Sequence, residues 1–94
     1  MGLVLKIREV EKGNHVLPHR RIKSISGAEG SLTWRYTHAE AVRHIEDRHF
    51  HFYIEKNSRA LRVVVGQTPD GEKFLKTHVD TDGPVELIEW PGGA

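Results

Sequence analysis

The sequence predicts a small α+β domain, in which a mostly antiparallel sheet of five or six strands carries one helix on one face. Two observations lead to this fold class. Several short segments alternate apolar with polar residues, at the period of a half-buried strand, and turn residues separate them. One segment instead repeats its apolar residues at the period of a helix, directly after an N-cap signal.

The length and composition are those of a single folded domain. The chain has 94 residues, of which 37% are hydrophobic and 29% charged. This is enough apolar side chain for one core but not for two. We therefore expect one domain over residues 1–91, followed by a flexible tail at 92–94.

The first strand is expected over Leu3–Val10, where apolar residues alternate with basic ones. Gly13 and Asn14 form a turn signal, and Pro18 interrupts regular structure in the segment that follows. A long first loop is therefore expected after this strand.

A second and a third strand are expected before the helix. Ile22 and Ile25 are three residues apart, which fits neither a plain strand nor a short helix. We interpret Arg21–Ser26 as a short strand that contains a bulge and ends at Gly27. The aromatic and β-branched residues of Leu32–Tyr36 predict the next strand.

The helix is expected over residues 37–48. Thr37 is followed three positions later by Glu40, the pattern in which a hydroxyl and a carboxylate cap the first turn of a helix. The face that packs on the sheet consists of Ala41, Val42 and Ile45.

The second half of the chain predicts further strands. Alternation recurs over Phe50–Glu55 and Leu61–Val65, and a type I turn at Thr68–Gly71 predicts a hairpin whose second arm is Glu72–Val79. We expect residues 80–84 to form a turn and Val85–Trp90 to add an edge strand.

Composition also restricts the class of protein. The formal net charge of +1 argues against a histone-like protein, and the absence of cysteine excludes disulfides and thiolate metal sites. No apolar run approaches the length of a membrane span. We expect a cytoplasmic protein that does not enter the membrane.

Histidines are frequent, with seven in the chain. His49 and His51 are two apart on an expected strand, and His38 lies on the apolar side of the expected helix, so these three could converge, with His78 as a fourth. The spacing supplies no complete ligand set. We therefore expect ordinary histidines and no metal, and keep His38, His49 and His51 as the candidate ligands.

Catalytic motifs are absent from the sequence. The serines have no nucleophile-elbow context, and Gly27 and Gly30 complete neither a dinucleotide-binding nor a P-loop pattern. We therefore favour a non-enzymatic role without a cofactor.

One segment has the composition of a nucleic-acid contact. Residues 19–36 interleave cations with aromatic rings, as a surface that follows phosphates and stacks bases would. The candidate residues are Arg20, Arg21, Lys23, Trp34, Arg35 and Tyr36. The alternative is that Trp34 is a core residue and that the cations belong to a solvated loop.

The chain from Arg20 onward resembles the small bacterial proteins grouped as domain of unknown function 3892. The resemblance rests on Ile22, Ile25, Gly27, Trp34, Ala41, Ile45, Phe52-Tyr53, Gly71, the run Lys73-Phe74-Leu75-Lys76-Thr77, Asp80, Pro84, Leu87 and Pro91. It implies a stand-alone bacterial cytoplasmic domain and assigns no activity, substrate or cofactor.

The preferred functional hypothesis is a non-enzymatic module that binds another protein or a second copy of itself. An open antiparallel sheet has edges whose backbone groups pair readily with another strand. Nucleic-acid binding through residues 19–36 is the alternative hypothesis. A histidine metal site or a small enzyme ranks below both of these hypotheses.

Overall fold

The computed structural model describes residues 3–14, 16–80 and 84–90 and has an α+β fold. The expected fold class is confirmed, but the strands form two sheets, of four and three strands, instead of one. The four-stranded sheet has the order β1-β5-β6-β7 and the other the order β2-β3-β4. The strands are β1 (Leu3–Lys6), β2 (Glu9–Lys12), β3 (Ile22–Glu29), β4 (Leu32–Thr37), β5 (Phe50–Lys56), β6 (Arg59–Gln67) and β7 (Lys73–Thr77). The helical elements are η1 (Pro18–Arg20), α1 (His38–Glu46) and α2 (Val85–Glu89).

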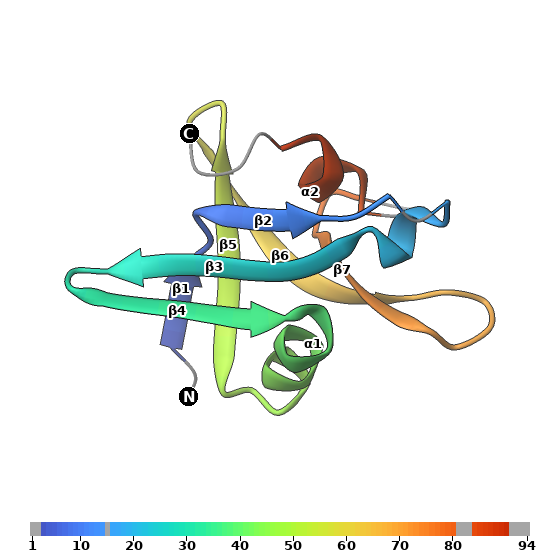
Figure 1. Cartoon of the computed structure of the whole chain (residues 1–94), viewed down its shortest axis with the longest axis horizontal. Helices are drawn as coiled ribbons and strands as arrows, with labels where there is room; N and C mark the ends of the chain where they lie inside the picture. Colours follow the sequence, from blue (N-terminus) through green and yellow to red (C-terminus); the bar gives the residue numbers. More distant parts are fainter. Residues whose placement is uncertain (1–2, 15, 81–83, 91–94) are drawn as a thin grey trace.

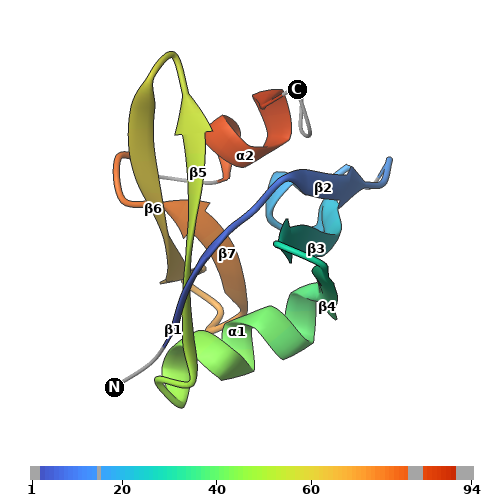
Figure 2. The same ribbon diagram turned by 90° about the vertical axis from the view of Figure 1, so that its left-hand side faces the viewer.

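The two sheets face one another, and their strands cross (Figure 1). Figure 2 shows α1 and α2 at opposite ends of the space between the sheets, so that both helices lie on the same side of the four-stranded sheet. The core fills this space and draws its residues from both sheets and both helices. Its members include Leu5, Ile7, Val10, Ile25, Ala41, Val42, Phe52, Ile54, Leu61, Val63, Leu75, Leu87 and Trp90.

The expected first strand, Leu3–Val10, is divided between the sheets. The Ile7 N–H donates to Tyr53 O at 2.8 Å in the four-stranded sheet, whereas the Arg8 N–H donates to Ser26 O at 2.9 Å in the other. Consecutive residues therefore bond to different sheets. This corner is the reason that one alternating segment forms both β1 and β2.

The bulge expected in the second strand is present. Lys12 is opposite Ile22 while Glu11 is opposite Ser24, which leaves Lys23 as the extra residue of β3. The bulge lets Ile22 and Ile25 both be buried. The expectation that this strand ends at Gly27 is wrong, because β3 continues to Glu29 and forms a hairpin with β4.

The capping signal of the helix is confirmed. The Glu40 N–H donates to Thr37 Oγ1 at 3.2 Å, and the Thr37 N–H donates to Glu40 Oε1 at 2.9 Å. The helix ends at Glu46, two residues before its expected end. On its apolar face Ala41 and Val42 are buried, but Ile45 is only partly buried.

The hairpin expected at Thr68–Gly71 is confirmed between β6 and β7, with a hydrogen bond from the Gly71 N–H to Thr68 O at 2.9 Å in its turn. Strands β5 and β6 form another antiparallel pair. The edge strand expected at 85–90 is wrong, because this segment forms α2. Its buried residues Leu87 and Trp90 are three apart, at the spacing of a helix face. Residues 81–83 of the expected turn and the tail at 92–94 lie outside the described residues.

Candidate binding surfaces

The candidate metal ligands are placed apart from one another. His38 Nε2 accepts a hydrogen bond from the Leu75 N–H at 3.1 Å. The His49 ring packs on the ring of His44, with 5.7 Å between centroids, and His51 Nδ1 lies 3.5 Å from a guanidinium nitrogen of Arg62. Within the described ranges, no three histidine, aspartate or glutamate side chains are arranged to hold a metal ion.

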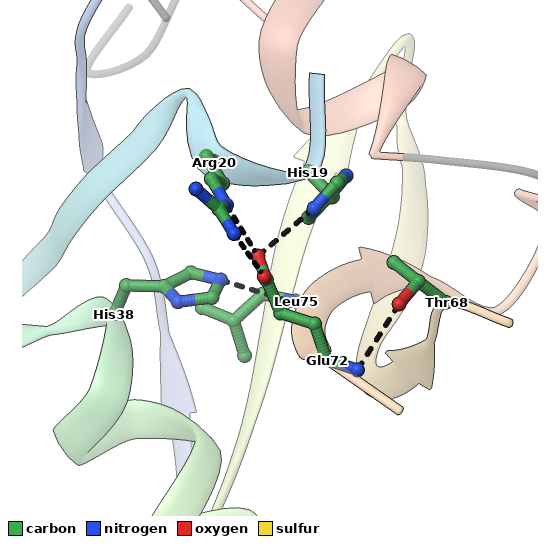
Figure 3. A network of polar contacts seen from close by, with 6 residues as sticks. All are labelled: His19, Arg20, His38, Thr68, Glu72 and Leu75. Atoms are coloured by element: carbon green, nitrogen blue, oxygen red, sulfur yellow. Dashed lines mark hydrogen bonds and ion pairs between the residues drawn. The ribbon is translucent and has the colours of Figure 1, made fainter. Parts of the chain in front are cut away.

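The candidate cations of residues 19–36 are largely engaged by the protein itself. Arg20 forms two hydrogen bonds with Glu72, at 2.8 Å and 2.6 Å (Figure 3). Arg35 pairs with Glu11, and Arg21 donates to Val16 O. Phosphate binding here would have to compete with the two carboxylates.

The Arg20–Glu72 pair also involves His19, whose Nε2 lies 2.9 Å from Glu72 Oε2. Hydrogen bonding to Arg20 lowers the pKa of the Glu72 carboxyl below its ordinary value. The Glu72 N–H in turn donates to Thr68 Oγ1 at 3.0 Å (Figure 3). These contacts hold η1 against the turn that precedes β7. We therefore assign the network a structural role.

The candidate aromatic residues Trp34 and Tyr36 face the opposite side of β4 from Arg35. Trp34 and Tyr36 alternate with Arg35 along β4, so they lie on the opposite face of the strand. The Trp34 ring packs on Phe52 of the facing sheet, with 5.4 Å between ring centroids, and the Tyr36 ring packs on Phe50 at 5.6 Å. Trp34 and Tyr36 therefore lie on the other face of β4 from Arg35, although Trp34 and Arg35 both line one surface hollow beside β3.

These rings belong to an aromatic cluster that opens to solvent between β1 and β4. A groove of about 330 Å³ lies there, and apolar side chains form most of its lining. Its rim includes Val4 and Leu32, whose exposed fractions of 62% and 72% are high for large apolar residues. The lining residues are Val4, Leu5, Glu29, Leu32, Thr33, Trp34, Tyr36 and Phe50.

Two buried ring nitrogens in this cluster have no hydrogen-bond partner among the residues that the structure describes. They are Trp34 Nε1 and His44 Nδ1. Buried polar atoms are normally paired, and exceptions to this rule are more frequent at functional sites than in a core. The cluster therefore has a feature of a binding site.

The backbone edge of β4 next to the groove is open. The Ser26 carbonyl accepts from Arg8 on the β2 side, so Arg35, which is opposite Ser26, directs its own backbone groups away from β3. Thr33 is two residues earlier and has the same orientation. No backbone partner for these two residues is found among the described parts of the chain.

The edge formed by β7 is closed by side chains instead. The Leu75 N–H donates to His38 Nε2, and the Thr77 N–H donates to Asp80 Oδ2 at 3.0 Å. An incoming strand would have to displace both acceptors. Of these two edges, β4 is the one that offers unpaired backbone groups beside an apolar groove.

Sequence reasoning identified Trp34 and Tyr36 but missed Val4, Leu32 and Phe50 as parts of the groove. One signal was present, since Val4 is an apolar residue at an outward position and interrupts the alternation of Leu3, Leu5 and Ile7. The approach of β1 to β4 had no local signal, because it depends on how the two sheets pack.

Comparison of the chain with protein families, with curated proteins and with solved structures finds no match. In the part of the chain that the structure describes, no helix is long and apolar enough to cross a membrane.

Proposed function

We propose that the protein is a non-enzymatic interaction module that binds an extended segment of a partner protein along β4. The observation that carries this proposal is the open backbone edge at Thr33 and Arg35, directly beside the apolar groove. Backbone hydrogen bonds to an edge strand supply affinity, and pockets for alternate side chains supply specificity.

The chemistry of the groove indicates what the segment contains. An apolar side chain would cover Val4 and Leu32, which are otherwise largely exposed. Glu29 also lines the groove and forms no ion pair with any described residue. We expect the partner segment to place a basic residue next to the apolar one.

Two features support a partner protein over nucleic acid at residues 19–36. The cations Arg20 and Arg35 are paired with carboxylates, and the rings of Trp34 and Tyr36 are turned toward the facing sheet. A reducing cytoplasm is the compartment that we propose, since the chain has no cysteine.

The test is selection from a library of random linear peptides displayed on phage, followed by measurement of the affinities of the selected peptides. We expect enrichment of segments that alternate apolar residues and carry a basic residue beside one of them. Thr33→Pro removes an outward N–H without removing a bond to β3, and should weaken binding about tenfold. Leu32→Glu should weaken it further.

The matched control is Val16→Glu, because Val16 is 80% exposed and lies outside the groove. It should bind selected peptides like the unmodified protein, and binding should change little between low and high salt. The proposal is overturned if no segment is enriched, or if Thr33→Pro and Leu32→Glu bind normally. A dimer that Thr33→Pro dissociates would also overturn it, because the occupant would then be a second copy.

A further inference from the structure

The outer face of the four-stranded sheet is not covered by either helix. Both helices and the other sheet lie on its opposite side (Figure 2). Phe52 and Ile54 of β5 are buried in the core, so the alternating residues His51 and Tyr53 face outward. Arg62 of β6 is directly opposite Tyr53 and faces outward with it.

These outward residues surround a hollow of about 510 Å³. Its lining consists of Tyr53, Arg62, the imidazoles of His51 and His78, and the apolar residues Val4, Phe52 and Ala60. The volume falls within the range typical of sites for small organic ligands. It is larger than a phosphate group alone requires.

The side chains that line the hollow include basic groups and no acidic ones. Arg62 forms no ion pair with a described carboxylate. On the same face of β5 the carboxylate of Glu55 is neutralised by Lys6, at 3.2 Å. Arg62 therefore differs from Arg20 and Arg35, which are both held by glutamates.

Hydrogen bonds from Arg62 are accepted at Nδ1 of both imidazoles, which leaves Nε2 of each ring as a donor. The Arg62 backbone N–H donates to His78 Nδ1 at 3.1 Å, so the proton of a neutral His78 ring is on Nε2. His51 Nδ1 lies 3.5 Å from Arg62 Nη2, and because arginine offers only donors, Nε2 of His51 carries the proton as well. The hollow thus combines a guanidinium with two ring N–H groups.

We propose that this hollow binds a phosphate group attached to a planar ring, as in a nucleotide. The Arg62 guanidinium would bind the phosphate oxygens, for which its paired donors are suited, with His51 and His78 as further donors. The ring of Tyr53 would stack on the base. The same chemistry is offered by a free nucleotide and by a nucleotide within a single strand of RNA.

The experiment measures binding of AMP, inorganic phosphate, adenosine and a short oligoadenylate to the full chain, by calorimetry and by NMR of backbone amides. AMP should bind more tightly than phosphate or adenosine, and the shifted amides should map to β5, β6 and residue 78. Arg62→Gln should weaken AMP binding at least about tenfold. Tyr53→Leu should weaken AMP binding while leaving phosphate binding unchanged.

Arg59→Gln is the matched control, because Arg59 is an exposed arginine of the same strand that does not line the hollow. It should bind AMP normally. If the affinity of oligoadenylate, expressed per nucleotide, is no higher than that of AMP, the ligand is a free nucleotide. Tighter binding that weakens as the salt concentration rises identifies a single strand instead. The inference is wrong if AMP does not bind at millimolar concentration, or if Arg62→Gln binds it like the unmodified protein. The groove beside β4 is tested separately, since neither Thr33 nor Leu32 lines this hollow.

Discussion

His38 Nε2 accepts a hydrogen bond from the backbone N–H of Leu75 at 3.1 Å. This contact joins the first turn of α1 to the outer edge of β7 and occupies a donor that would otherwise be free to pair with another strand. Because Nε2 is the acceptor, the bond requires the neutral imidazole. Burial lowers the pKa of His38 below its ordinary value of 6.5, an effect that the charge of Glu72 partly opposes.

The first prediction is a loss of stability in acid that depends on His38. The folded state binds a proton at His38 less readily than the unfolded chain does, because the folded pKa is lowered. The contribution of His38 is therefore complete above pH 6.5 and decreases as the pH falls below that value. Urea unfolding measured between pH 7.5 and about 5 should show this decrease.

Two variants separate titration of His38 from loss of its hydrogen bond. His38→Gln keeps a side-chain acceptor that does not titrate, so its free energy of unfolding should vary less with pH. His38→Ala leaves the buried Leu75 N–H without its acceptor and should lose about 1–3 kcal/mol near pH 7.5. An unchanged pH dependence in both variants would assign the acid sensitivity to another group.

Local patterns of the sequence were sufficient to predict most elements. Thr37 and Glu40 specified the helix start, and the three-residue spacing of Ile22 and Ile25 specified the bulge of β3. Both features depend on residues that are close together in the chain. They could therefore be read without knowledge of the packing.

The two sheets could not be predicted in this way. The alternation that begins at Leu3 continues through Ile7, although Ile7 and Arg8 bond to different sheets. Nothing local to these residues marks the corner, which is fixed by the pairing of β1 with β5 and of β2 with β3. The groove between β1 and β4 results from the same packing, so its residues were found only in part.

The second prediction compares two isoleucines that the sequence assigns to the core. The alternating pattern of a strand assigns Ile54, and the apolar face of the helix assigns Ile45. Ile54 is completely buried, whereas Ile45 of α1 is only partly buried. Ile54→Ala should reduce the free energy of unfolding by about 2–5 kcal/mol. Ile45→Ala should cost clearly less, which chemical denaturation of the two variants can measure. Equal losses would mean that Ile45 is buried more deeply than the structure describes.

The third prediction concerns the turn between β5 and β6. Asn57 and Ser58 both have positive φ, at 52° and 64°. Asparagine tolerates this region, but serine is strained there. Ser58→Gly should therefore raise the free energy of unfolding, by about 0.5–1 kcal/mol. Ser31→Gly is the control, because Ser31 does not have a positive φ and the substitution should give no gain.

The fourth prediction concerns Gly27, where β3 meets the free edge of β1. A Cβ atom at this position would lie 2.6 Å from both Lys6 O and Trp34 Cζ2. Backbone and ring would have to move apart, so Gly27→Ala should cost about 1–3 kcal/mol and change the fluorescence of Trp34. Trp90→Phe as a background leaves Trp34 as the only source of tryptophan fluorescence.

Gly30→Ala separates this contact from a general effect of replacing a glycine in the same hairpin. Gly30 has a φ of +61° and open space around its Cβ position, so alanine there is strained only through the backbone. Gly30→Ala should therefore lower the free energy of unfolding but leave the emission spectrum of Trp34 unchanged. Because Trp34 lines the groove between β1 and β4, displacement of its ring by the methyl group that Gly27→Ala adds should also weaken binding of selected peptides, whereas Gly30→Ala should not. Normal peptide binding by Gly27→Ala, together with a changed Trp34 spectrum, would show that the ring is not part of the peptide site.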